Sequence, residues 1–343
     1  MPLPPRTGAF RIEALSFIYE TSIDPERENN AHSLALSLVG FNKRVLEVGC
    51  STGYFTKVLV ERGCDVVGME IDPGAAEKAE AWAERVVVGN LDELHVWDEV
   101  KDESFDVVVM GDVLEHLREP LASLRQAVRK LKPSGFVVTS LPNIAHGDVR
   151  IALLNGRFRY NETGLLDRTH VHFFTLETIR QLMFEAGLVV VDTKRVVMPL
   201  FQSEIGVTRE DISHKTLDDL HADPEVESYQ YVMKSVRDNG SEELLMLSRR
   251  VNELGDRVHN QRMRIALLRK GLVDNAILQD GLAEHQRYVK ALEEHVSGLE
   301  HNIEVLTESL AVADAKYHAV LAQRAPLSRG IYNRIRRVLA KPG

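Results

Sequence analysis

Short apolar runs rich in β-branched residues alternate with segments of helical spacing through residues 43–141 of this chain. The runs are RVLEV, DVVGM, RVVVG, FDVVVM and GFVVTSL, and the segments between them include GYFTKVLVERG and PLASLRQAVRKL. Apolar strands that alternate with helices are typical of a parallel sheet covered on both faces. The pattern predicts a doubly wound α/β domain. Asp72 and Pro73 mark a helix start, and Lys132 and Pro133 mark a helix end.

Two further strands are expected to complete the sheet. Thr175 is a candidate N-cap for the helix LETIRQLMFEAG, which Gly187 ends, and the strand LVVVDTKRVVM follows. A last strand, YQYVMKSV, closes the sheet near Val236. We therefore expect an N-terminal helical cap over residues 1–40 and an α/β domain over residues 41–240.

Heptad spacing replaces this pattern after Ser241. Leucine, valine and isoleucine recur at heptad positions over residues 244–272 and again over residues 289–310, but the two runs are out of phase. The change near Leu282 predicts a stammer, a kink or a hairpin. The heptads favour a long helical coiled coil over residues 241–324 through which the protein self-associates. The alternative is a pair of helices that fold back on the α/β domain.

The chain ends in a basic amphipathic tail over residues 325–343. Its apolar side chains fall on one helical face and it has no acidic residue, as in helices that lie at membrane surfaces. The tail is either a peripheral contact with an anionic membrane or a solvated end without a partner. Its basic residues are Arg329, Arg334, Arg336, Arg337 and Lys341.

Composition excludes several other classes. The formal net charge of the 343 residues is -9, which argues against nucleic acid as a partner because such binding relies on clustered Lys and Arg. Cys50 and Cys64 are the only cysteines, so neither a disulfide framework nor a thiolate zinc site is indicated. Prolines and charges interrupt the first twenty residues, and the chain has no apolar run of about 18 residues. We expect a cytoplasmic protein.

The stretch VLEVGCSTGYF joins the first strand to the first helix. Its pattern is acidic-x-Gly-x-small-x-Gly, with Glu47, Gly49, Ser51 and Gly53 at the defined positions. Small residues let a ligand approach the backbone, and a helix N-terminus offers amide donors. A nicotinamide dinucleotide site instead uses G-x-G-x-x-G. That frame would need a third glycine where Tyr54 stands, so the dinucleotide interpretation is disfavoured.

Together these motifs resemble those of class I S-adenosylmethionine-dependent methyltransferases over residues 30–236. The resemblance implies that the loop after Glu47 holds the methionine part of the cofactor and that Glu70, in VVGMEIDP, binds the ribose hydroxyls, since a carboxylate offers paired acceptors. GNLDEL resembles the adenine-edge motif, although Asn90 stands where an acidic residue is common, and Ser51 replaces a usual glycine. The resemblance implies S-adenosyl-L-methionine as cofactor, bound by Glu47, Gly49, Cys50, Ser51, Gly53, Glu70, Ile71, Asn90, Leu91 and Asp112.

Residues 142–175 follow the fifth strand, at the edge where open α/β sheets bind ligands, so they are expected to form the wall of an acceptor site. Histidine titrates near neutral pH and serves as a general base. His146 and His170 are the candidates, with Asp167 as a partner. His172 alternates onto the same side as His170, and a packing or hydrogen-bonding role is open for it.

A metal site is a further alternative. The HVH stretch lacks identifiable additional ligands, whereas Asp112, Glu115 and His116 resemble the metal cluster of some quinone-precursor O-methyltransferases. Glu115 and His116 more often orient and cap the short helix at this position, so we expect no metal.

Three functions follow from these observations. SLPNIAHGDVR, LLNGRFRY and GLLDRTHVHFFT together resemble a bacterial subgroup associated with glycan and lipopolysaccharide biosynthesis. The favoured expectation is methyl transfer to a sugar hydroxyl in surface glycan biosynthesis, with a lipid-linked glycan or a sugar as acceptor. The alternatives are a small-molecule or quinone-type O-methyltransferase and a non-catalytic coiled-coil scaffold. The intact set Glu47, Gly49, Gly53 and Glu70 favours turnover.

Overall fold

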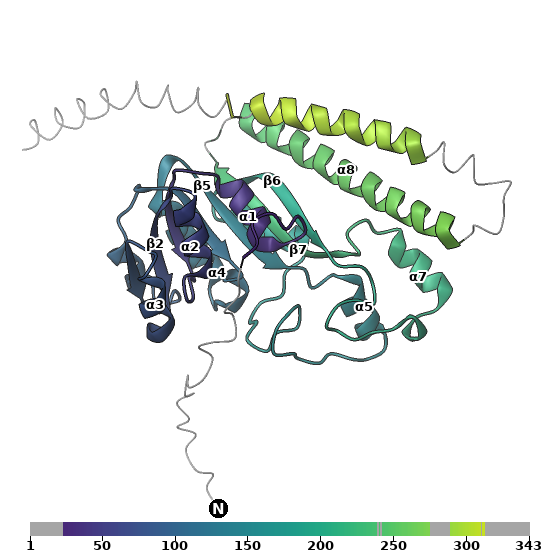
Figure 1. Ribbon diagram of the computed structural model, residues 1–343, viewed down its shortest axis with the longest axis horizontal. Helices are drawn as coiled ribbons and strands as arrows, with labels where there is room; N and C mark the ends of the chain where they lie inside the picture. The colour runs from purple at the N-terminus through teal and green to yellow at the C-terminus, as the bar shows by residue number, and fades with distance from the viewer. Residues whose placement is uncertain (1–22, 239, 241, 275–288, 310, 313–343) are drawn as a thin grey trace, which may run out of the picture.

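The computed structural model describes residues 23–238, 240, 242–274, 289–309 and 311–312 (Figure 1). One seven-stranded sheet forms the centre, in the order β3-β2-β1-β4-β5-β7-β6. β1 to β5 pair in parallel, and β7 is antiparallel to both of its neighbours. The predicted α/β sheet is thereby confirmed. The strands are β1 (Arg44–Val48), β2 (Asp65–Glu70), β3 (Arg85–Val88), β4 (Phe105–Gly111), β5 (Leu131–Pro142), β6 (Leu188–Val197) and β7 (Ser228–Arg237).

Helices cover both faces of the sheet, because alternate side chains of each strand enter opposite cores. In β1, Val45 packs with α1 and α2, whereas Leu46 belongs to the core that α4 and α6 cover. The helices of this domain are α1 (Ala31–Val39), α2 (Tyr54–Glu61), α3 (Pro73–Ala79), α4 (Pro120–Lys130), α5 (Gly147–Leu154), α6 (Leu176–Glu185) and α7 (His214–His221).

The predicted helix starts are confirmed by their caps. Asp72 accepts a hydrogen bond from the backbone of Ala75, with Pro73 in the first turn, and Thr175 forms a capping box with Thr178. The expected helix end near Pro133 is wrong by a few residues. α4 ends at Lys130 and β5 starts directly after it, so that the proline lies within a long strand.

Two segments at the carboxyl ends of the strands build a small satellite unit. α5 and α7 lie together beside the sheet (Figure 1) and share a separate apolar core that includes Ile151, Leu200 and Leu220. Asp148 fixes the unit, because its carboxylate accepts hydrogen bonds from Phe201 N (2.8 Å) and Ser203 Oγ (2.6 Å). The segment between β5 and α6 is thus held in place rather than left as an open loop.

The first C-terminal helix, α8 (Glu242–Asp274), packs against β6. Ser248 Oγ and Asn252 Nδ2 both donate to the carbonyl of Val190, each at 2.6 Å. The following helical segment, residues 289–309, lies alongside α8 (Figure 1), and Leu254 and Val296 share an apolar cluster. This arrangement matches the alternative in which the helices fold back on the domain. The expected self-association stays a prediction.

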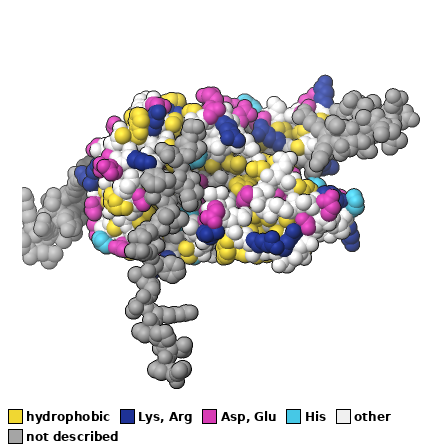
Figure 2. All heavy atoms as spheres, turned by 60° about the horizontal axis from the view of Figure 1, so that its bottom comes forward, with side chains coloured by type: hydrophobic (Ala, Val, Ile, Leu, Met, Phe, Trp, Pro, Cys, Tyr) yellow, Lys and Arg dark blue, Asp and Glu magenta, His cyan; other side chains and the backbone are white. Residues whose placement is uncertain are grey.

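Several expectations fall on residues that the structure does not describe. These are the start of the N-terminal cap (residues 1–22), the heptad phase change near Leu282 and the basic tail (residues 325–343). Within the described ranges, none of the helices combines the length and apolar character needed to cross a membrane. On the face seen in Figure 2, hydrophobic side chains lie in separate groups among charged ones.

Candidate functional site

The loop between β1 and α2 makes a tight turn at the carboxyl end of the sheet. Gly49 and Gly53 have φ angles of 74° and 81°, in the left-handed region that favours glycine. A Cβ on Gly49 would lie 2.6 Å from Val113 Cγ2, and one on Gly53 would lie 2.8 Å from Ala79 Cα. Side chains at these two positions would push the loop out of place, so both glycines are required by geometry.

Glu70 holds this loop from the end of β2. Its Oε2 accepts a hydrogen bond from Ser51 N at 2.8 Å, and its Oε1 accepts from Ile71 N at 2.9 Å and Asp72 N at 3.0 Å. A carboxylate has about four acceptor positions, so these three bonds leave capacity for one more donor. The carboxylate is therefore both a brace for the loop and an available acceptor beside it.

Glu47 is buried beneath the same loop, where Thr56 Oγ1 donates to its Oε2 at 2.6 Å. Burial raises the pKa of Glu47 to about 8, and the negative charge of Glu70 adds to the shift, while the Thr56 hydrogen bond opposes it. The protein therefore favours the neutral form of this carboxyl group.

Glu47→Gln is expected to stabilise the fold increasingly as pH rises. A carboxyl group with a raised folded-state pKa contributes stability below its unfolded pKa of 4.5 and loses it as pH rises through about 8. Glutamine keeps the acceptor for Thr56 and does not ionise. The melting temperature of the variant should exceed that of the wild type by a margin that grows over this pH range. A difference in melting temperature that does not change with pH would show that Glu47 is not held in its neutral form.

The other residues that the sequence predicts to bind the cofactor make mainly backbone and turn contacts within the protein. Cys50 is buried, and its amide donates to the carbonyl of Met69 at 3.1 Å. The carbonyl of Leu91 accepts from Trp97 Nε1 at 3.1 Å. Asn90 Oδ1 accepts from Asp92 N at 3.1 Å, which shapes the turn after β3. Ile71 is exposed beside the end of β2.

Asp112 follows β4 with a left-handed φ of 53°. Its Oδ1 accepts hydrogen bonds from Ser140 Oγ at 3.0 Å and from Gln230 Nε2. Asp112 is in contact with solvent. The surrounding protein nevertheless removes water from its carboxylate and raises the pKa of Asp112 to about 6, although the hydrogen bonds from Ser140 and Gln230 act to lower that pKa. Strain at a non-glycine residue and a perturbed carboxylate are both common at functional sites.

The segment between β5 and α6 turns back onto the end of β4. The amides of Val171 and His172 both donate to the carbonyl of Glu115, at 2.8 and 3.0 Å, and Asn143 forms a bridge with Phe174. These contacts place His170 next to Glu115, although the two residues are far apart in the sequence.

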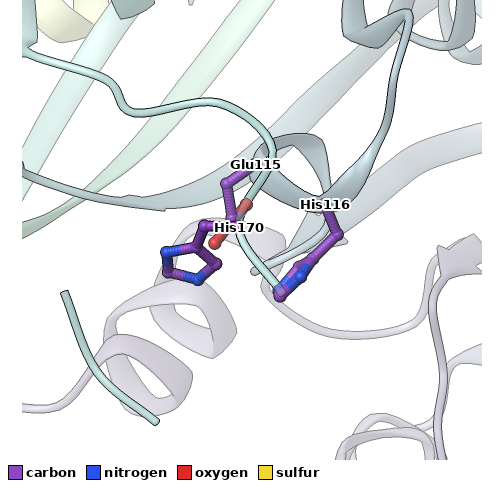
Figure 3. Close-up of side chains that lie close together, drawn as sticks. All are labelled: Glu115, His116 and His170. Carbon is purple, nitrogen blue, oxygen red and sulfur yellow. The ribbon is translucent and has the colours of Figure 1, made fainter. Parts of the chain in front are cut away.

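Glu115, His116 and His170 form a cluster in which one ligand atom from each lies within 4.8 Å of the others (Figure 3). Glu115 Oε2 and His170 Nδ1 are buried without a hydrogen-bond partner among the described residues. Burial raises the pKa of Glu115 well above its usual value, and the charge of Asp112 adds to this shift. Burial, and next the charge of His116, lowers the pKa of His170 to about 4. The cluster therefore offers a neutral imidazole and a carboxyl group with spare bonding capacity.

The remaining expected catalytic residues have well-defined roles. His146 is buried, its Nε2 lies 2.8 Å from Met198 O and its Nδ1 accepts from Asp148 N at 3.2 Å. Both ring nitrogens are thus occupied, so this histidine caps α5 and has no lone pair left for a substrate proton. Asp167 Oδ1 accepts from Thr169 N and Thr169 Oγ1, at 2.7 and 2.6 Å.

The last expected histidine, His172, and two further residues, Glu115 and Gln230, lie at the same end of the sheet. His172 Nε2 lies 3.1 Å from the carbonyl of Arg118, which agrees with the hydrogen-bonding alternative for this residue. The sequence interpretation weighed Glu115 as a metal ligand, favoured a capping role for it, and overlooked Gln230. The DVLEHL motif was a signal for Glu115, whereas the contact of Gln230 with Asp112 depends on β7 lying beside β5.

Residues 25–193 match a family model that is described as a methyltransferase domain. Three relatives are named ubiquinone biosynthesis O-methyltransferase. That of Ruegeria pomeroyi is 29% identical over 175 residues, which cover 50% of this chain and 69% of the relative. That of Aliivibrio fischeri is 32% identical, and the match covers 35% of this chain and 52% of the relative. That of Cereibacter sphaeroides is 31% identical, and the match covers 45% of this chain and 63% of the relative. The chain thus spans about half to two thirds of the length of these relatives.

Proposed function

We propose, from the premise that this chain carries a class I S-adenosyl-L-methionine-dependent methyltransferase domain, that it methylates a hydroxyl group of a small-molecule or quinone-type acceptor. The naming of the relatives as O-methyltransferases of ubiquinone biosynthesis supports this acceptor class. The same similarity favours a phenolic hydroxyl over the sugar hydroxyl of a surface glycan that the sequence led us to expect.

The residues around the β1 loop fit the cofactor. Gly49 and Gly53 allow the left-handed turns that place the backbone of the loop at the carboxyl end of the sheet, and both pack so closely against Val113 and Ala79 that no side chain would fit. Glu70 keeps one acceptor position for a ribose hydroxyl. When bound, S-adenosyl-L-methionine supplies a methyl group that is already activated. The protein's task is then to align an acceptor oxygen with that group and to exclude water.

The Glu115, His116 and His170 cluster is the proposed place of acceptor activation, and the unpaired His170 Nδ1 is the observation that supports it best. An imidazole with a pKa of about 4 is neutral at pH 7, so it has a lone pair that can take the hydroxyl proton. It is a weak base, however. A phenol, with a pKa near 10 like that of tyrosine, loses its proton far more readily than an aliphatic alcohol does. This difference supports a phenolic acceptor.

The same cluster supports a second role for these three side chains. One carboxylate and two imidazoles are ligands of divalent transition metals, and their donor atoms are close enough to share one ion. We propose that a cation held there would lower the pKa of an acceptor hydroxyl and orient it. Our sequence interpretation considered a metal cluster of Asp112, Glu115 and His116 but expected no metal, because Glu115 and His116 more often orient and cap a short helix. The group of possible ligands in the fold has His170 in place of Asp112.

A methyl-transfer assay with labelled cofactor tests the function. Catechol and 3,4-dihydroxybenzoate should accept label, whereas sugar nucleotides and lipid-linked glycans should not. Label transfer to the glycans alone would show that the acceptor is a sugar hydroxyl.

Repeating the assay with a chelator separates the two proposed roles of the Glu115, His116 and His170 cluster. Activity that is lost and then restored by a divalent cation indicates a metal, and unchanged activity indicates that His170 acts as a base.

Glu70→Ala should weaken S-adenosyl-L-methionine binding by about 1.5–3 kcal/mol, the usual contribution of a hydrogen bond to a charged group. The variant loses the ribose acceptor and the brace on Ser51 together. Isothermal titration measures the dissociation constant. Glu77→Ala is the matched control, since Glu77 is an exposed carboxylate on the neighbouring helix α3. Equal affinities for the two variants would show that the cofactor lies elsewhere.

A further inference from the structure

A continuous series of aromatic rings leads from the protein surface to the proposed activation cluster. The ring centroids of Tyr160 and Phe158 are 5.4 Å apart, and those of Phe158 and Phe173 are 5.9 Å apart. Phe173 lies 6.1 Å from His170, which lies 4.8 Å from His116. All four contacts are edge-to-face, an arrangement that aromatic pairs favour. The series therefore gives one connected apolar wall that ends at the cluster.

The outer part of this wall is open to solvent. Phe158 is 43% exposed and Tyr160 is 54% exposed, whereas Phe173 is partly buried and packs against the apolar cluster of Leu165 and Leu166. Large apolar side chains that remain exposed together, rather than singly, mark binding surfaces in soluble proteins. The core of the fold does not account for Phe158 and Tyr160, because neither contributes to a buried cluster of the described residues.

The wall is also held in a fixed position. Asn155 Nδ2 donates to the carbonyl of Asp211 at 2.8 Å, and Arg157 forms an ion pair with Asp211 Oδ1 at 2.8 Å. These contacts tie the chain just before Phe158 to the satellite unit. A surface that is already ordered loses little conformational entropy when a ligand binds to it.

We infer that Tyr160, Phe158 and Phe173 bind the apolar portion of the acceptor, a hydrocarbon chain or second ring attached to the ring that carries the reactive hydroxyl. The inference rests on the proposed function, because it takes the cluster at His170 as the position of that hydroxyl. The wall touches the cluster at one end and is exposed at the other. An acceptor with its hydroxyl at His170 would therefore lay its remaining atoms along these three rings.

Binding of two probes tests the inference without turnover. Catechol and 4-hexylcatechol are titrated by calorimetry into the full chain saturated with S-adenosylhomocysteine. Each methylene that the wall buries should strengthen binding about fourfold, so hexylcatechol should bind at least about tenfold more tightly than catechol. Phe158→Ala and Tyr160→Ala should each reduce this ratio severalfold and leave the affinity for catechol nearly unchanged.

Phe184→Ala is the matched control, since Phe184 is 69% exposed on α6 and lies outside the ring series. The ratio should not change in this variant. Thermal unfolding of each variant shows that it is folded. The inference is overturned if hexylcatechol binds no better than catechol, if neither probe binds, or if Phe184→Ala lowers the ratio as much as Phe158→Ala does. Label transfer is measured separately, so loss of the proposed function would be seen apart from loss of the apolar site.

Discussion

His170→Ala is expected to lower kcat by about 10²–10⁴-fold, the usual contribution of a positioned acid or base, and to leave the dissociation constant of S-adenosyl-L-methionine within about twofold. The expectation follows from geometry. His170 Nδ1 is buried and unpaired beside Glu115, in the segment that faces the proposed acceptor. The cofactor loop is held by Glu70 from another part of the sheet edge.

His172→Ala is the control for this experiment. His172 lies two residues away in the same segment, and its Nε2 contacts the backbone of Arg118. Its replacement should affect local packing and change kcat little. Parallel loss of cofactor affinity and turnover in His170→Ala would show a structural role. Equal kcat losses in the two variants would assign the effect to the segment as a whole.

Glu225→Gln should destabilise the protein by about 3–5 kcal/mol, because it leaves a buried charge without its main partner. The side chain of Arg195 is only 6% exposed. Its Nη2 donates to Glu225 Oε1 and to Asp256 Oδ1, each at 2.6 Å, and its Nε also donates to Glu225. Glutamine preserves the shape of Glu225 but removes the charge. Among the described residues, Asp256 of α8 would then be the one carboxylate left to pair with the guanidinium.

Denaturant unfolding measures this effect, with Glu84→Gln as the control. Glu84 pairs with Arg44 at 2.9 Å on the surface, where such pairs contribute under about 1 kcal/mol. Similar losses in the two variants would contradict a special role for the buried network.

The contribution of Glu225 should also depend on pH. Burial alone works to raise the pKa of Glu225, but the hydrogen bonds and charge of Arg195 outweigh it and lower the pKa to about 2. The stability that Glu225 provides is therefore present above its unfolded pKa of 4.5 and is lost as pH falls toward 2. Glu225→Gln should consequently differ least from the wild type in strong acid.

Features set by neighbouring residues could be predicted from the sequence. The cap at Asp72 and the turn at Gly49 depend on a few adjacent side chains, and the alternation of apolar strands with helices required a covered sheet. The pairing of His170 with Glu115 could not be predicted, because it depends on how residues 143–175 return across the sheet. No local pattern encodes that path.

The packing of the C-terminal helices was ambiguous for a different reason. An apolar heptad face can bury itself against another copy or against its own domain, and its spacing is the same in both cases. The distinguishing signal was polar. Ser248, Asn252 and Asp256 recur at four-residue spacing on α8, and all three bind the domain, through Val190 and Arg195. A row of hydrogen-bonding residues beside the seam is better suited to a strand edge than to an apolar coil.

The position of α8 also bears on the solubility of the protein. β6 is the last strand of the sheet, and an edge strand with free carbonyl groups is a template on which another chain can add a strand and begin to aggregate. Ser248 and Asn252 occupy the outward carbonyl of Val190, next to a bulge in the pairing of β6 with β7. The helix thereby covers the edge at a point where it would otherwise be open. A protein truncated after β7 would expose this edge. If that truncated protein aggregated, the cause would be the uncovered strand β6 and not a defect in the catalytic domain.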